Sequence, residues 1–93
     1  MEKTELKNIL KEEGFRFVYE WKDTSTTFYP EHSHQDRVAL YIIGGELTFD
    51  FSGEKVTIKK GARFDVPAGK LHTAVVGREG CEFIVGEMID GDS

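Results

Sequence analysis

The sequence predicts a mostly β protein, either a sandwich or a small barrel, with one short helix at its N-terminal end. After residue 15, short β-rich runs alternate with turn residues such as glycine and proline. Within the runs, apolar and polar residues alternate with a period of two, which is typical of antiparallel strands with one solvated face. The chain has 93 residues, of which 39% are hydrophobic. This is enough for one core, so we expect a single domain over residues 1–93.

The helix is expected over residues 3–13. Leu6, Ile9 and Leu10 recur at helical spacing among lysines and glutamates, and Gly14 follows as a stop signal.

A strand with one bulky buried face is expected next. Phe15, Phe17, Tyr19 and Trp21 alternate with Arg16, Val18 and Glu20, a period of two that suits a strand. Residues 23–27 form a polar connection. The same aromatic face offers an apolar surface on which two copies of the chain could pair.

The remaining strands follow in short runs over 38–43, 46–51, 55–59, 63–66, 71–76 and 81–88. Gly44 and Gly45 separate the first two runs, and Ser52-Gly53 and Lys60-Gly61 close the next two. Closure into a barrel over about residues 15–88 would remove exposed strand edges. The polar tail over residues 90–93 is expected to fray.

Charge and hydropathy exclude some classes of partner. The chain has 12 Lys and Arg against 17 Asp and Glu, a net charge of −5. Nucleic-acid binding and binding to anionic membranes both require concentrated positive charge, which is absent, so neither is expected. No apolar run approaches the ~20 residues of a transmembrane helix. With no visible secretory signal and one cysteine, Cys81, the chain is expected in a reducing cytoplasm.

All three histidines fall in two places, His32-Ser33-His34 and His72. The spacing of the first pair places both rings on one face of a strand, where they can share one metal ion at ~2.0–2.2 Å. A third imidazole from a neighbouring strand would complete a set with open positions. The alternative for the pair is two exposed polar residues near a turn, and for His72 a buried polar residue satisfied by backbone or water.

These residues also carry a resemblance to the cupin superfamily, over about residues 26–88. The second cupin motif is present from Gly61 through Pro67-Ala68-Gly69 to His72. The first motif is partial, with His32-Ser33-His34 and Gly45 in place. Three positions depart from the pattern: its opening glycine is Thr26, its glutamate ligand would be Val38 or Ala39, and the closing asparagine of the second motif is Val76.

The resemblance implies a double-stranded β-helix, or jelly-roll barrel, and commonly a homodimer. It also implies several functions, including dioxygenases, isomerases and decarboxylases, and non-catalytic modules that bind sugars or other ligands. A scaffold barrel with remnant histidines is a further alternative.

The predicted site is a divalent transition metal, Zn, Ni, Fe, Mn or Cu, held by His32, His34 and His72. Three neutral imidazoles leave its charge near +2, which favours a small anionic ligand. Asp36 is the first candidate for an extra ligand, followed by Gln35 or Glu31, although Asp36 paired with Arg37 as an exposed loop carboxylate is the favoured alternative. The residues predicted to line the pocket are Val38, Leu40, Ile42, Phe64 and Val76.

Other side chains carry weaker signals. Tyr29, Tyr41, Phe28, Phe64 and Phe83 could line a pocket, but aromatic residues at alternating spacing usually belong to a core. Cys81 is expected to be a half-buried, inert thiol.

Overall fold

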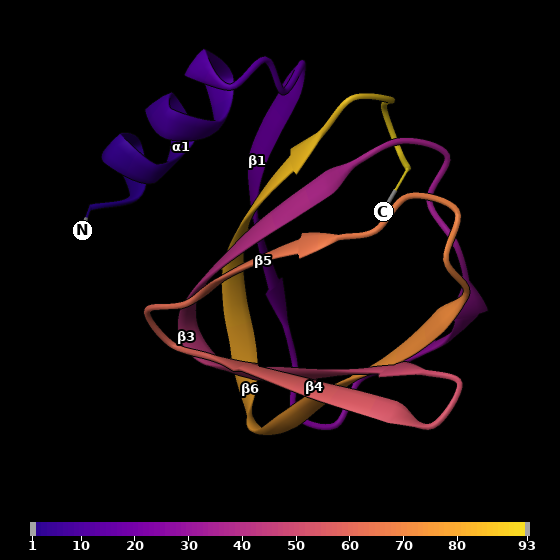
Figure 1. The fold of residues 1–93 in the computed structure, drawn as a ribbon. Helices are drawn as coiled ribbons and strands as arrows, with labels where there is room; N and C mark the ends of the chain where they lie inside the picture. The colour runs from indigo at the N-terminus through magenta and orange to yellow at the C-terminus, as the bar shows by residue number, and fades with distance from the viewer. Residues whose placement is uncertain (1, 93) are drawn as a thin grey trace.

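A computed structural model describes residues 2–92, which form one helix and six strands (Figure 1). No helix among these residues is long and apolar enough to cross a bilayer. The predicted mostly β fold with a short N-terminal helix is confirmed. The elements in chain order are α1 (Lys3–Glu12), β1 (Phe17–Asp23), β2 (Phe28–His32), β3 (Val38–Phe51), β4 (Glu54–Lys59), β5 (Arg63–Val66) and β6 (His72–Glu87).

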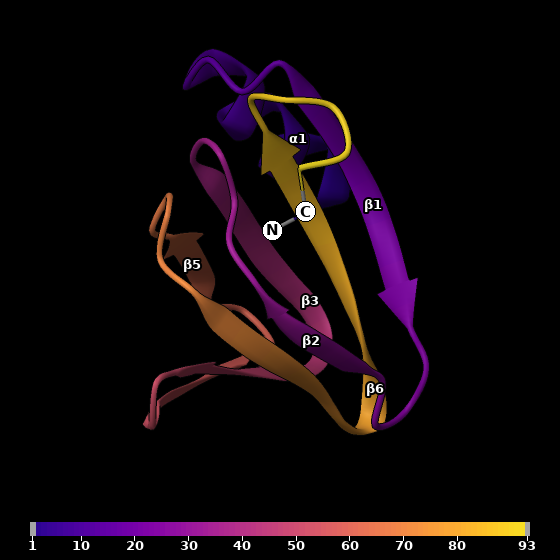
Figure 2. The same ribbon diagram turned by 90° about the vertical axis from the view of Figure 1, so that its right-hand side faces the viewer.

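The two long strands, β3 and β6, shape the molecule because each contributes to two layers. The first part of β3 pairs with β5 and with the end of β6, where Val38 lies opposite Glu87. The second part pairs with β4 and with the beginning of β6, where Leu47 lies opposite Val76. β1 extends the layer at the end of β6, and β2 extends the layer at its beginning. Figures 1 and 2 show both long strands bending between the layers.

The glycine pair at Gly44-Gly45 bends β3 instead of ending it, contrary to the prediction of two separate strands. The register with β6 is irregular on both sides of the pair, as in a β-bulge. Gly45 has φ of +71°, and a Cβ atom there would lie 1.9 Å from the carbonyl oxygen of Gly80. The predicted runs 71–76 and 81–88 likewise belong to one strand, β6. At this bulge the backbone of β6 therefore lies too close to Gly45 to leave room for a side chain.

Alternate residues of the strands build the core inside the barrel, as the period of two predicts. On β3, Leu40 and Ile42 face this interior, whereas Ala39 packs on the opposite side. The buried interior cluster consists of Val38, Leu40, Ile42, Leu47, Phe49, Phe51, Ile58, Val66, Ala74, Val76, Cys81, Phe83 and Val85.

A second, smaller cluster attaches the helix to the outside of the barrel. Leu6 and Leu10 of α1 pack with Phe15, Ala39 and Ile84. Figure 1 shows α1 beside β1, outside the layers.

The bulky face predicted for the first strand is only partly buried. Phe15 is buried, but it precedes β1 and packs under α1, because its amide returns to the carbonyl of Leu10 in the turn after the helix. Tyr19 is partly buried against the interior cluster, while Trp21 is 51% exposed. The four aromatic side chains therefore do not share one environment.

Candidate metal centre

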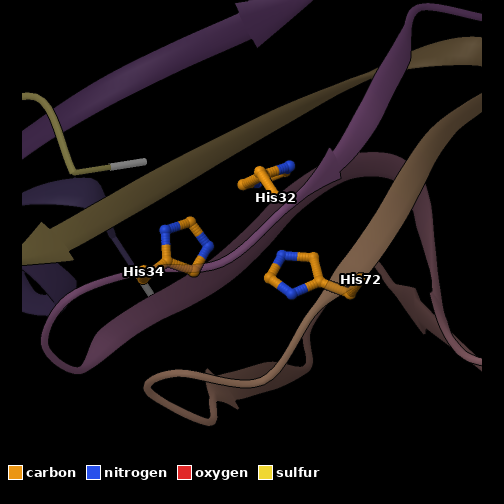
Figure 3. Close-up of side chains that lie close together, drawn as sticks. All are labelled: His32, His34 and His72. Carbon is orange, nitrogen blue, oxygen red and sulfur yellow. The ribbon is translucent and has the colours of Figure 1, made fainter.

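The three histidines come from two neighbouring strands and the loop that follows one of them. His32 is the last residue of β2 and lies opposite His72, the first residue of β6. His34 lies two residues beyond the end of β2, so the pair is not on one strand as predicted. The chain nevertheless turns so that its ring joins the other two (Figure 3).

The three rings are close enough to share one ion. The ring centroids lie 5.1 Å apart for His32 and His34, 4.5 Å for His32 and His72, and 5.0 Å for His34 and His72. One ligand nitrogen from each ring lies within 4.8 Å of the others. Each metal–imidazole bond spans ~2.0–2.1 Å, so a single divalent ion between these atoms needs little rearrangement.

Each imidazole is held by a backbone carbonyl, which determines where its proton lies. Nδ1 of His32 is 2.7 Å from the oxygen of Pro30, Nδ1 of His72 is 2.9 Å from that of Lys70, and Nδ1 of His34 is 2.5 Å from that of Asp92. A carbonyl only accepts hydrogen bonds, so Nδ1 carries the proton in each ring. The lone pair of every neutral ring therefore lies on Nε2, as in histidines that bind metals.

Burial supports the same protonation state. His34 and His72 are 4% and 1% exposed, and Nε2 of His72 is buried with no hydrogen-bond partner among the described residues. Burial lowers the pKa of His72, the neighbouring His32 and His34 lower it further, and only the bond to Lys70 opposes the shift. His72 thus stays neutral and offers an unpaired lone pair, which fits a metal ligand.

The histidines open onto a cavity of about 250 Å³ between the layers. Its wall is mostly apolar and aromatic. Besides the three histidines, it is lined by Tyr19, Trp21, Tyr29, Val38, Leu40, Leu47, Phe49, Val66, Ala74, Phe83 and Val85.

Of the predicted pocket residues, Val38 and Leu40 line this cavity. Ile42, Phe64 and Val76 pack in or against the same interior cluster but do not line the cavity. The aromatic residues divide in the same way. Tyr29 and Phe83 line the cavity, Phe64 belongs to the core, Tyr41 packs in the cluster under α1, and Phe28 is 60% exposed.

Asp23, the last residue of β1, holds two of the aromatic side chains of the cavity wall. Its carboxylate accepts hydrogen bonds from the Tyr29 hydroxyl and, at 2.9 Å, from the Trp21 indole. Burial and then the Asp23 carboxylate raise the pKa of Tyr29, so its hydroxyl stays protonated as the donor in this contact. Both aromatic rings are thereby fixed in orientation at the cavity.

Asp92 fixes the loop that carries His34, although the tail was predicted to fray. Its carboxylate accepts hydrogen bonds from the amides of Gln35 at 2.9 Å and Asp36 at 3.1 Å, while its carbonyl receives His34 Nδ1. The last residue of the predicted tail, residue 93, lies outside the described residues. Nothing local in the sequence marks this contact, because its partners are more than fifty residues apart along the chain.

The predicted extra ligands lie on the outside of this loop. Gln35, Asp36 and Glu31 are all exposed. The carboxylate of Asp36 accepts a hydrogen bond from the amide of Arg37 at 2.7 Å, and it does not belong to the group of ligand atoms formed by the histidines. A role for these three residues as ligands remains a prediction.

No carboxylate stands where the first cupin motif would place its glutamate. Val38 lines the cavity as an aliphatic side chain, and Ala39 faces the cluster under α1. The three imidazoles alone would therefore leave the charge of a divalent ion near +2 at this end of the cavity.

Comparison with known proteins agrees with the fold. A model of the cupin domain family, Cupin_2, matches residues 23–86, whereas no curated protein matches the sequence. A cupin-2 domain containing protein from Shewanella frigidimarina is similar at a TM-score of 0.63 and 20% identity, over 73% of this chain and 65% of that one. KdgF from a Halomonas species is similar at 0.63 and 21%, over 78% and 69%.

The polyketide cyclase RemF from Streptomyces resistomycificus has the same fold at a TM-score of 0.65 and 21% identity, over 77% of this chain and 54% of that one. The chain thus spans less than two thirds of the length of some of these proteins. Identities this low show a shared fold.

Proposed function

The chain belongs to the cupin domain family, and on this basis we propose that it binds one divalent transition metal ion through His32, His34 and His72 and presents that ion to a small anionic molecule. The observation that carries the proposal is the convergence of three imidazoles, each of which hydrogen-bonds a backbone carbonyl through Nδ1. This leaves the Nε2 lone pair of each ring available to a metal ion. Zn, Ni, Fe, Mn and Cu all accept imidazole ligands.

The charge of the site supports an anion as the remaining ligand. Apart from the three histidines, the described residues that line the cavity include no carboxylate, ammonium or guanidinium group. A divalent ion would therefore be the dominant charge in an otherwise apolar space. A carboxylate or similar group at the ion, joined to an apolar or aromatic body against Tyr29 and Phe83, fits both parts of the cavity.

Two uses of such a site differ in whether the bound molecule changes. As an enzyme of cupin type, a dioxygenase, isomerase or decarboxylase, the protein would rely on the ion as Lewis acid or oxygen-activating centre. As a binding protein, it would hold the molecule without turnover. The lack of any acid or base in the lining besides the histidines and tyrosines favours binding.

Cobalt-loaded protein tests the anion directly, because visible absorption of Co²⁺ reports its ligands. We expect benzoate and phenylacetate to shift the spectrum and to saturate, with neutral benzyl alcohol as the control. An unchanged spectrum with every carboxylate would contradict an anion site. Mass spectrometry of the recovered acids, with air and Fe²⁺ present, separates turnover from binding.

We also propose that the protein forms homodimers in the cytoplasm. Trp21 and Phe28, 51% and 60% exposed, are apolar surface that pairing of two copies would cover. Light scattering at micromolar concentration should give twice the chain mass of 10.5 kDa, and a monomer would contradict the dimer.

A further inference from the structure

Glu87, at the end of β6, is a buried carboxylate that the proposed metal site does not yet include. It is 0% exposed, and both of its carboxylate oxygens lack a hydrogen-bond partner among the described residues. It also takes part in none of the ion pairs among those residues. An ionised carboxylate buried without a partner is strongly unfavourable, and a positive charge nearby would compensate it.

The strand register places Glu87 on the inner side of the barrel. Phe83 and Val85, at alternate positions before it on β6, both line the cavity, whereas Ile84 packs outside under α1. A period of two therefore turns the side chain of Glu87 toward the interior. Its neighbours across the strands, Phe17 on β1 and Val38 on β3, carry no charge that could pair with it.

Glu87 lies opposite Val38, one of the two positions at which the first cupin motif would carry its glutamate. Of the two, Val38 lines the same cavity as the three histidines, whereas Ala39 packs outside under α1. Directly opposed residues on antiparallel strands have Cβ atoms only ~4.5–5.5 Å apart. The carboxylate that is missing from β3 thus has a counterpart on the adjacent strand.

Few polar side chains are buried in this molecule. Only three polar or charged residues in the described part of the chain are buried: His34, His72 and Glu87. Two of them are proposed metal ligands, and the third is the one buried carboxyl group. Glu87 lies outside the group of atoms close enough to share the ion, so it is not a fourth direct ligand, and its charge would complement that of the ion instead.

We infer that Glu87 is the negative charge that balances a divalent ion held by His32, His34 and His72. Glu87 lies on β6, and it supplies the charge that the family pattern gives to a residue on β3. The net charge of the loaded site is then near +1. This inference depends on the proposed metal binding. Outer-shell groups that hydrogen-bond metal ligands are worth a factor of ~10–100 in metal affinity, and we expect an effect of similar size from the charge of Glu87.

The test is a competition titration of Zn²⁺ against a chromophoric chelator, using untagged protein. Glu87→Gln keeps the shape of the side chain and removes its charge, and we expect it to weaken Zn²⁺ binding by about 10–100-fold. Glu12→Gln is the matched control, because it removes the same charge from an exposed position at the end of α1, outside the barrel. The control should stay within about threefold of the wild type, since exposed charges are screened.

A second readout does not depend on affinity alone. In metal-free protein Glu87→Gln should raise the midpoint of thermal unfolding, because it removes an uncompensated buried charge. The rise in the midpoint on adding Zn²⁺ should be smaller than in the wild type. Glu87→Met, of similar length and without a polar group, is measured alongside in case the glutamine variant does not fold.

Three results would overturn the inference. A loss of Zn²⁺ affinity below tenfold in the Glu87 variants, or an equal loss in Glu12→Gln, would remove Glu87 as the counter-charge while leaving the histidine site intact. Wild-type protein that does not bind Zn²⁺ at all would instead refute the proposed function, and this inference with it.

Discussion

The Nδ1 atom of His34 lies 2.5 Å from the main-chain oxygen of Asp92, a residue 58 positions further along the chain. The carboxylate of Asp92 accepts hydrogen bonds from the amides of Gln35 and Asp36, the two residues that follow His34 in the same loop. One residue thus sets the orientation of the ring and holds the loop that carries it. The histidine site depends on this turn after β6.

Replacing Asp92 should therefore weaken metal binding without touching a ligand. We expect Asp92→Ala to lower Zn²⁺ affinity by about tenfold, in the range typical of groups that orient metal ligands. The lost hydrogen bonds should also cost about 1–2 kcal/mol of stability. Asp90→Ala, an exposed position in the same turn, is the control for both titration calorimetry and chemical unfolding. Equal affinities for the two variants would contradict the role of Asp92.

The stability of metal-free protein should fall in acid because of His72. Its pKa in the folded state is below the ordinary value of 6.5, chiefly through burial, so the unfolded chain binds a proton that the native one resists. The contribution of His72 to the free energy of unfolding is fully present above pH 6.5, and it declines as the pH falls toward the lowered pKa.

Urea unfolding in the presence of a chelator, at pH 7.5 and 5.5, measures this effect. The pH dependence should be smaller in His72→Gln than in the wild type, because glutamine does not titrate. Parallel pH profiles for the two proteins would argue against a neutral, buried His72.

Gly45 should tolerate no side chain. A Cβ atom at this position would lie 1.9 Å from the carbonyl oxygen of Gly80 on the paired strand β6, and φ of Gly45 is +71°. We expect Gly45→Ala to destabilise the fold by about 4 kcal/mol or more, as in the most severe single substitutions. Gly53→Ala is the control, since φ is also positive but no atom lies within 4 Å of the added carbon.

The control should cost only about 1–2 kcal/mol, the penalty of the left-handed conformation alone. Denaturant unfolding of both variants gives the difference. Similar losses of stability in the two variants would show that the close approach of β3 and β6 does not require glycine at position 45.

Cys81 should be unreactive in the folded protein. It is 3% exposed, and burial, followed by the carboxylates of Asp23 and Glu46, raises the pKa of its thiol to about 11. At pH 8 almost no thiolate exists, and thiolate is the form that reacts. A chromogenic disulfide reagent should label the thiol only after addition of guanidinium chloride, and rapid labelling of native protein would contradict this burial.

Local patterns were sufficient to predict the helix, the β-rich remainder of the chain and the grouping of the three histidines. The helix predicted over 3–13 is Lys3–Glu12, because its apolar spacing and the following glycine act within a few residues. Val38, Leu40 and Ile42, predicted to face the pocket, all belong to the interior cluster, although Ile42 does not line the cavity. The resemblance to cupins rested on the residues from Gly61 to His72, and the family match confirms it.

Features that depend on distant partners could not be predicted in this way. Gly44-Gly45 has the same local composition whether the chain turns or bends, and only pairing with β6 distinguishes the two. The contact of Asp92 with the His34 loop has no local signal at all. Glu87 did have a local signal, since it continues the alternation of Phe83 and Val85. Its significance appears only when β6 is paired with β3, where Glu87 lies opposite Val38.

The metal content of untagged protein tests the central claim most directly. After equilibration with Zn²⁺ and gel filtration, elemental analysis should find about one ion per chain in the wild type and almost none in His32→Ala/His72→Ala. Glu54→Ala/Lys55→Ala, a double change of exposed residues on β4, should retain the ion. Equal metal content in the histidine variant and the wild type would contradict the three-histidine site.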